Sequence, residues 1–216
     1  MEKKNNTTEL VFILDRSGSM AGLESDTIGG FNSMLEKQKA EDGEAYVTTV
    51  LFDSHHQIIH DRLDLKEVKP LTKKEYFVRG STALYDAVGT TVEHIAGIHK
   101  YARREDVPAH TMFVIITDGM ENSSRRFSRQ MLKNLIEKQK EEYGWEFMFI
   151  GANIDAEETA ESFGIDRGRA ANYIPDSEGT QIIYDAVCCN VSSVRAGKAM
   201  CDDWSEKIDE DYKKRK

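Results

Sequence analysis

The sequence predicts an α/β protein with a doubly wound, mostly parallel central sheet, one antiparallel edge strand and helices on both faces. Short apolar runs alternate along the chain with longer segments whose apolar residues recur at helical spacing. That alternation is typical of βαβ units. Several of the short runs are continuous rather than alternating, which indicates strands covered by helices on both faces.

The strands follow from these runs. Unbroken or nearly unbroken apolar segments predict buried strands at 10–14, 112–116 and 145–150. Two more strands are expected at 44–53 and 56–62. The tight Asp53-Ser54-His55 turn between them predicts an antiparallel hairpin at one edge of the sheet. A last strand is expected at 171–174, before Pro175.

Four apolar stripes at helical spacing predict helices that pack on the sheet. The first follows a Ser25-Asp26 start, the second opens at Leu84, the third follows Ser128, and the fourth runs from about Glu178 past Trp204. A shorter helix is expected around 156–163. We expect a flexible segment at 1–8, a single domain over 9–212 and a basic, frayed C-terminal end at 213–216.

Composition excludes several classes of function. The 216 residues carry 29 Lys and Arg against 38 Asp and Glu, a formal net charge of −9, which disfavours nucleic acid as a partner. The polar N-terminus lacks the apolar core of a secretion signal, and no apolar stretch reaches the length of a membrane span. The three cysteines, Cys188, Cys189 and Cys201, all lie near the C-terminal end, and two of them are adjacent, so they cannot cross-link a fold of this size. We therefore expect a cytoplasmic protein with no membrane contact.

Polar side chains gather where two predicted strands end. The strand at 10–14 leads into Asp15-Arg16-Ser17-Gly18-Ser19, and the strand at 112–116 leads into Thr117-Asp118-Gly119. A third segment, Arg79-Gly80-Ser81-Thr82, precedes a predicted helix. Ligands of open α/β sheets bind at this carboxyl edge. The candidate metal ligands are all oxygen donors, as Mg²⁺ prefers: Asp15, Ser17, Ser19, Thr82 and Asp118.

These three segments give the chain a family resemblance. It resembles von Willebrand factor A domains that carry a metal-ion-dependent adhesion site, through Asp15-x-Ser17-x-Ser19, Thr82 and Asp118-Gly119. The resemblance covers most of the chain, from about Glu9 to Val194, and the short loops are similar to those of compact intracellular bacterial members. It implies a Rossmann-like fold and one bound Mg²⁺, with Mn²⁺ or Ca²⁺ as substitutes.

The resemblance also implies a role for each ligand. Ser17 and Ser19 would contact the metal, and Thr82 would join directly or through water. Asp15 and Asp118 would hold the ion mainly through waters. An acidic side chain of a partner protein would complete the coordination shell.

Further residues could shape the rim of such a site. Basic side chains that could draw in an acidic ligand follow the two aspartates: Arg16, Arg125, Arg126 and Arg129. The last three also fit the solvated start of a helix. Asn153 and Asp155 leave another strand at the same edge, and Asp155 also fits a helix cap.

Two other clusters have simpler explanations than a site. His55, His56 and His60 could suggest zinc, but they lie on the edge hairpin without a fourth ligand, so we expect exposed hairpin histidines. Cys188 and Cys189 fall on the fourth predicted helix, where a free thiol behaves as a small hydrophobe.

The expected function is a metal-dependent protein-interaction module and not an enzyme. The partner would be a protein with an exposed Asp or Glu, such as an ATPase or a stress-response component. The alternative is an Mg²⁺-dependent phosphatase or phosphotransferase with Asp15 as nucleophile, although no general acid is evident beside it. Nucleotide binding is disfavoured, because the G-x-x-x-x-G-K-[ST] motif is absent.

Overall fold

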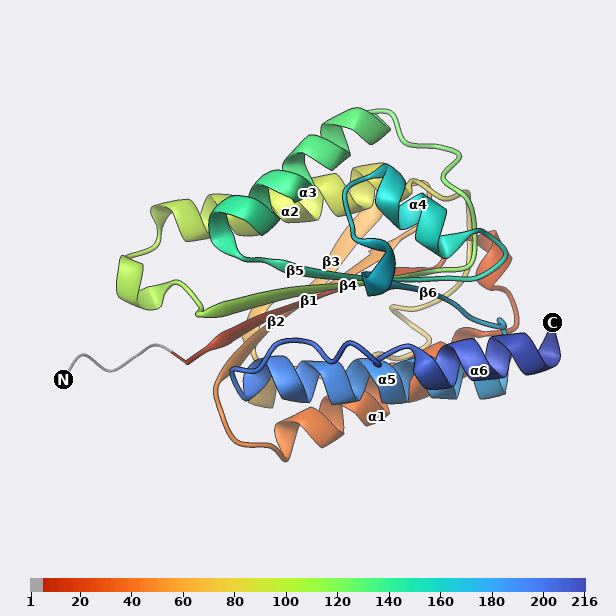
Figure 1. Cartoon of the computed structure of the whole chain (residues 1–216), viewed down its shortest axis with the longest axis horizontal. Coiled ribbons are helices and arrows are strands. Elements are labelled where there is room, and N and C mark those ends of the chain that lie inside the picture. The colour runs from red at the N-terminus through yellow and green to blue at the C-terminus, as the bar shows by residue number, and fades with distance from the viewer. Residues whose placement is uncertain (1–5) are drawn as a thin grey trace.

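A computed structural model describes residues 6–216 (Figure 1). Its central sheet has six strands in the order β3-β2-β1-β4-β5-β6. The strands are β1 (Thr8–Asp15), β2 (Ala45–Phe52), β3 (His56–Asp64), β4 (His110–Thr117), β5 (Glu146–Gly151) and β6 (Ala170–Asn172). Neighbours pair in parallel except β2 and β3, which form the antiparallel hairpin at one edge. The predicted fold class is confirmed.

Helices cover both faces of the sheet. One layer holds α2 (Leu84–Tyr101), α3 (Arg129–Tyr143) and α4 (Ala156–Ser162), and the other holds α1 (Glu24–Lys39), α5 (Ser177–Arg195) and α6 (Glu206–Arg215) (Figure 1). Two buried apolar clusters fill the space between the sheet and its two helical layers. Strands covered on both faces need apolar side chains throughout, which explains their continuous apolar runs.

The topology sets the place of a ligand site. From β1 the chain moves to β2 and β3 on one side, then crosses to β4, β5 and β6 on the other. The strand order therefore reverses between β1 and β4, which pair directly, with Leu14 opposite Ile116. At such a switch point the loops diverge and leave a crevice at the carboxyl edge.

The C-terminal region differs from the prediction. The single helix expected from Glu178 past Trp204 is two helices, because α5 ends at Arg195 and α6 begins at Glu206. Gly197 lies between them with φ of +71°, a left-handed conformation that ends a helix. Trp204 is buried, and its indole N–H donates to the Gly168 carbonyl at 2.8 Å. This contact holds the connection against the rest of the domain.

The two ends of the predicted domain also need correction. The C-terminal end is helical to Arg215, whose guanidinium pairs with Asp176 and Asp211 instead of fraying into solvent. At the other end β1 begins at Thr8, which is fully buried, one residue before the predicted domain start. Residues 1–5 of the predicted flexible segment lie outside the described residues. Within 6–216, no helix combines the length and the apolar character needed to cross a membrane.

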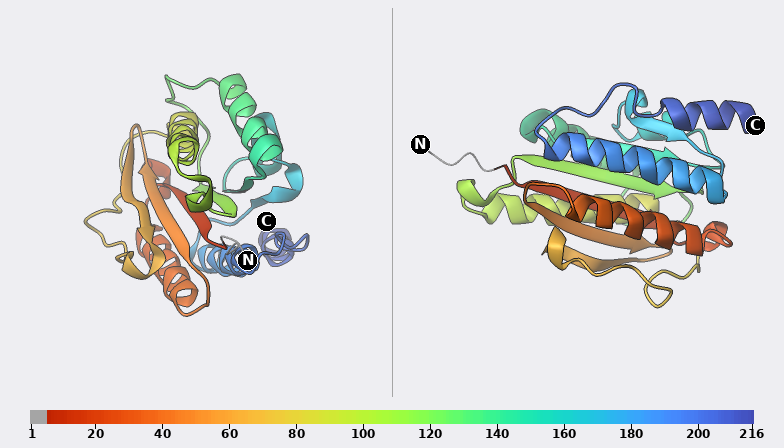
Figure 2. Two further views of the ribbon diagram at one scale, coloured as in Figure 1. Left: turned by 90° about the vertical axis from the view of Figure 1, so that its left-hand side faces the viewer. Right: turned by 90° about the horizontal axis from the view of Figure 1, so that it is seen from below.

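Close contact between α1 and α5 depends on a glycine (Figure 2). A Cβ placed on Gly30 of α1 would lie 2.3 Å from Cδ2 of Tyr184 on α5. A Cβ on the preceding Gly29 would meet nothing within 4 Å. The ring of Tyr184 therefore packs directly on the α1 backbone at Gly30.

We expect opposite effects from alanine at these adjacent positions. Gly30→Ala should lower the free energy of unfolding by about 1–3 kcal/mol, because it overpacks a buried contact. Gly29→Ala should raise it by up to about 1 kcal/mol, because alanine is the better helix former. Urea denaturation of both variants measures the difference, and equal effects would contradict the α1–α5 packing described here.

Candidate metal centre

Three loops at the carboxyl edge bring the predicted metal ligands together. The Ser19 hydroxyl donates to Asp118 Oδ1 at 2.6 Å, and the Ser17 and Ser19 hydroxyls lie 3.0 Å apart. The Thr82 hydroxyl donates to Ser17 Oγ at 3.1 Å. A continuous chain of oxygen atoms thus links residues far apart in the sequence. Its members are buried except for Ser19, through which the cluster faces solvent.

Asp15 is the innermost member of the cluster. It is the last residue of β1 and only 1% exposed. Its Oδ1 accepts the Ser17 backbone N–H at 2.7 Å, and its Oδ2 accepts the Thr117 hydroxyl at 2.6 Å. Both carboxylate oxygens are therefore engaged, one by the turn that carries Ser17 and the other by the end of β4.

The two carboxylates share a buried site without a basic neighbour. Within residues 6–216, neither Asp15 nor Asp118 forms an ion pair. Burial raises the pKa of Asp15 to about 6, against the hydrogen bonds from Thr117 and Ser17, and the charge of Asp118 adds to the rise. Burial also raises the pKa of Asp118. Uncompensated buried charge is costly, so this donor set fits a bound cation.

The loops approach one another closely at two glycines. The Gly18 backbone N–H donates to the Gly80 carbonyl at 3.1 Å, which joins the first loop to the second. A Cβ on Gly119 would lie 3.1 Å from Ser19 Oγ and 3.4 Å from Thr82 Oγ1. A side chain at Gly119 would therefore push on two of the candidate ligands.

Supporting residues that were not singled out from the sequence hold the loops in place. Asn122 accepts the Thr82 backbone N–H at 2.9 Å through Oδ1 and donates its own N–H to the Thr82 carbonyl at 3.1 Å. Thr117 and the Tyr76 hydroxyl both bind Asp15, at its side chain and its carbonyl. Thr117 could have been found from the sequence, because it directly precedes Asp118. Asn122 and Tyr76 contact residues of other loops, so no sequence pattern near them indicates their role.

The prediction that Arg16 lies on the rim is wrong. Arg16 is 1% exposed, and its Nε donates to Asp53 Oδ2 at 2.9 Å. Its terminal nitrogens donate to the Glu75 carbonyl at 2.9 Å and to Gln57 Oε1 at 3.2 Å. The reason is Asp53, which follows β2 beside the end of β1 and draws the guanidinium inward.

The other rim candidates have mixed outcomes. Arg125 and Arg126 are exposed, and Arg126 pairs with Glu93 of α2. Asn153 reaches the candidate site, since its Nδ2 donates to the Asp118 carbonyl at 3.3 Å. Asp155 caps α4 by accepting the Glu158 backbone N–H at 2.9 Å, which was its simpler interpretation.

The histidine and cysteine clusters form no second centre. His60 is buried, contrary to the expectation of exposure, and its Nδ1 lies 3.0 Å from Thr49 Oγ1. In the described part of the chain, no group of three or more His, Cys, Asp or Glu residues is placed to hold a metal. Cys188 is buried on α5, as expected of a small hydrophobe, while Cys189 and Cys201 are exposed.

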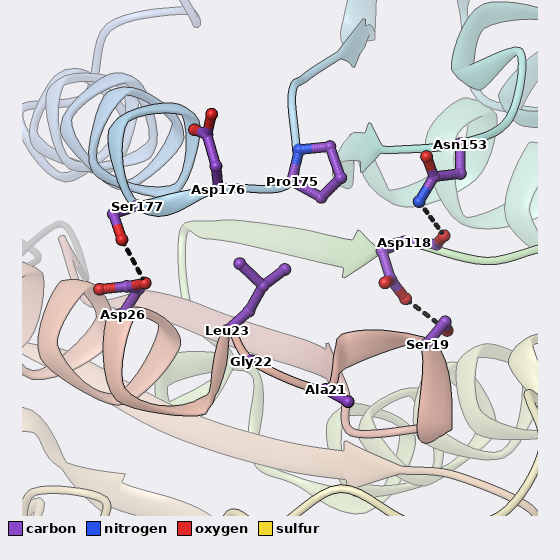
Figure 3. Close-up of a pocket in the computed structure, with 10 residues that line it drawn as sticks. All are labelled: Ser19, Ala21, Gly22, Leu23, Asp26, Asp118, Asn153, Pro175, Asp176 and Ser177. Carbon is purple, nitrogen blue, oxygen red and sulfur yellow. Dashed lines mark hydrogen bonds between the residues drawn. The ribbon is translucent and has the colours of Figure 1, made fainter.

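A pocket of about 340 Å³ adjoins the candidate metal centre (Figure 3). It opens between the loop after β1 and the connection from β6 to α5. Ser19 and Asp118 form its border with the centre, and Asp26 accepts the Ser177 hydroxyl at 2.7 Å across it. The remaining lining residues are Ala21, Gly22, Leu23, Asn153, Pro175 and Asp176.

Comparisons by sequence find nothing: no family model and no curated protein matches this chain. Comparison by structure finds many similar folds. A variant of the PilB minor pilin from Streptococcus sanguinis has a TM-score of 0.61 at 14% identity, covering 86% of this chain and 61% of that one. A von Willebrand factor type A protein from Catenulispora acidiphila has a TM-score of 0.59 at 14% identity, covering 86% of this chain and 43% of that one.

A third similar structure is proximal thread matrix protein 1 from the mussel byssus, solved with zinc in its metal-ion-dependent adhesion site (MIDAS) motif. Its TM-score is 0.59 at 13% identity, and the match covers 86% of this chain and 46% of that one. The chain thus spans roughly half the length of the solved structures it resembles. At such low identity the likeness concerns the fold, and the chain has the α/β fold of von Willebrand factor A domains.

Proposed function

We propose that this protein is a metal-dependent interaction module that binds an acidic side chain of a partner protein through a divalent cation. The cation would be held by Asp15, Ser17, Ser19, Thr82 and Asp118. One observation carries the proposal: two buried carboxylates without a basic partner converge with three hydroxyls at the switch point of the sheet. A bound cation would compensate their charge and leave a position facing solvent.

The donor set supports a hard cation. All five candidate ligands offer oxygen, and the hydroxyls outnumber the carboxylates. We therefore propose Mg²⁺ as the native ion, with Mn²⁺ or Ca²⁺ as substitutes. Neutral hydroxyls leave the ion electrophilic, and a carboxylate is the protein group best matched to it.

The geometry of Asp15 supports binding rather than catalysis. Its two oxygens already accept hydrogen bonds, and the side chain is almost fully buried. A nucleophile needs an accessible lone pair aimed at its substrate. This argues against the phosphatase or phosphotransferase alternative. A cytoplasmic bacterial module that serves an ATPase or a stress-response component remains the proposed setting.

Metal binding is tested with isosteric variants of two acids. Asp118→Asn should weaken Mg²⁺ binding by about 10- to 100-fold. This is the usual effect of removing a group that holds the direct ligands of a metal in place by hydrogen bonds. Asp42→Asn removes an equal charge from an exposed residue between α1 and β2, at the opposite edge of the sheet, and should have no effect. Isothermal titration calorimetry measures both. Equal affinity of the two variants would place any bound metal elsewhere.

The affinity for Mg²⁺ should also depend on pH. Asp15 must lose its proton to support the cation, and burial raises its pKa to about 6. Protons therefore compete with the metal below that pH, and the apparent affinity at pH 5 should be about tenfold weaker than at pH 7. Calorimetry at the two pH values measures this. A flat profile would show that Asp15 does not take part.

The partner contact is tested by affinity capture. We expect protein captured by the wild-type chain in Mg²⁺ to be released by EDTA and not to be held by Asp118→Asn. Asp42→Asn should capture it as the wild type does. Replacing the acidic residues of the captured protein by amides should identify a carboxylate needed for binding. Capture undiminished in EDTA would contradict the mechanism, even with a metal bound.

A further inference from the structure

Arg79 lies directly beside the candidate metal centre, in the loop that ends at Thr82. Its backbone N–H donates to the Arg16 carbonyl at 2.9 Å, next to Ser17. The following residue, Gly80, accepts the Gly18 backbone N–H. The backbone of Arg79 is therefore fixed to the same turn that carries the candidate serine ligands.

The guanidinium of Arg79 is held in place but open to solvent. Its Nε donates to Asp53 Oδ2 at 2.8 Å, and the group lies over the Phe77 ring at 5.1 Å. The side chain is nonetheless 49% exposed. Its terminal nitrogens donate no hydrogen bond to any residue in 6–216. They present free donors at a fixed position.

Arg79 also carries a surplus positive charge. The same Asp53 oxygen accepts Arg16 Nε at 2.9 Å, so one carboxylate lies between two guanidinium groups. Burial alone would raise the pKa of Asp53, but hydrogen bonds from Arg79, the His55 N–H and Arg16 hold it below its usual value. Asp53 thus carries one negative charge against two positive ones. The unbalanced charge faces solvent at Arg79, because Arg16 is buried.

The opposite flank of the centre has a different character. Arg79 lies on the side of β2, whereas the pocket of Figure 3 lies toward β5 and β6. Besides Asp118, which belongs to the candidate centre, that pocket is lined by Asp26, Asp176 and neutral residues. Asp176 pairs with Arg215, which also pairs with Asp211, and Asp26 has no ion pair in the described part of the chain. A second acid would be repelled on this flank and attracted on the other.

We propose that the partner presents two neighbouring acidic side chains, one for the cation and one for Arg79. This inference rests on the proposed metal-dependent binding. A guanidinium presents paired N–H donors that match a carboxylate. Because Asp53 and Phe77 already orient the group, little side-chain entropy is lost on binding. The two contacts define a direction, so the acidic segment lies across the edge with its second acid toward β2.

A displayed random-peptide library tests the inference without a known partner. The library is bound to immobilised protein in Mg²⁺, and retained clones are eluted with EDTA. Wild-type protein should enrich peptides with two nearby acidic residues, whereas Arg79→Gln should enrich peptides with one. Arg104→Gln is the matched control, because it removes an equal, exposed charge just before β4, at the far edge of the sheet. It should select as the wild type does.

One selected peptide then gives the size of the contact. Replacing its second acid by the corresponding amide should weaken binding to the wild type about 5- to 10-fold, the range expected for a half-exposed charge-assisted pair. The same replacement should leave binding to Arg79→Gln unchanged, and Arg79→Lys should show a smaller loss than the wild type. This double-mutant cycle separates the contact between Arg79 and the second acid from general effects of charge.

The outcomes separate the inference from the function on which it rests. EDTA-eluted peptides with a single acid, equally enriched by wild type and Arg79→Gln, would overturn the role of Arg79 and leave metal-dependent binding intact. An equal shift in Arg104→Gln would assign the preference to net charge and also overturn it. A library without EDTA-eluted clones would contradict the proposed function, and the inference with it.

Discussion

Two buried carboxylates that lack a basic partner are the constraint on which the arrangement of this edge depends. Asp15 and Asp118 approach each other because β1 and β4 are neighbours at the point where the strand order reverses. Each then needs compensation, and hydroxyl groups from Ser17, Ser19 and Thr117 supply part of it. Hydrogen bonds to neutral donors spread a charge without cancelling it. A bound cation would therefore stabilise this site more than it would stabilise an ordinary turn.

The second loop depends on a different pairing. Asp53 is buried beside the cluster but lies between Arg16 and Arg79, so its charge is more than balanced. This pairing ties the end of β2 to the turn after β1 and fixes the loop that carries Thr82. Asp15 ends β1 and Asp53 directly follows β2, yet they have different roles. Asp53 fixes the loops, whereas Asp15 belongs to the oxygen cluster that we propose binds a cation.

How much the sequence could predict depends on the range of each contact. Asp15 and Asp118 follow apolar runs directly, and parallel strands bring their carboxyl ends to one edge, so local pattern was enough. Arg16 was misplaced because its partners, Asp53 and the Glu75 carbonyl, come from elements that no spacing relates to it. The break after α5 depends on the left-handed Gly197, one glycine among many, and no local pattern distinguished it.

The net charge of the whole chain makes the local charges around the candidate centre important for binding an acidic partner. A formal net charge of −9 repels an acidic partner at long range, and salt screens that repulsion beyond about 10 Å. Close to the edge, the fixed positive charge of Arg79 lies on one side of the centre and the acidic pocket on the other. The charge on the two flanks of the centre is therefore asymmetric. Under the proposed binding mode, this asymmetry would let the edge select an acidic segment by its orientation.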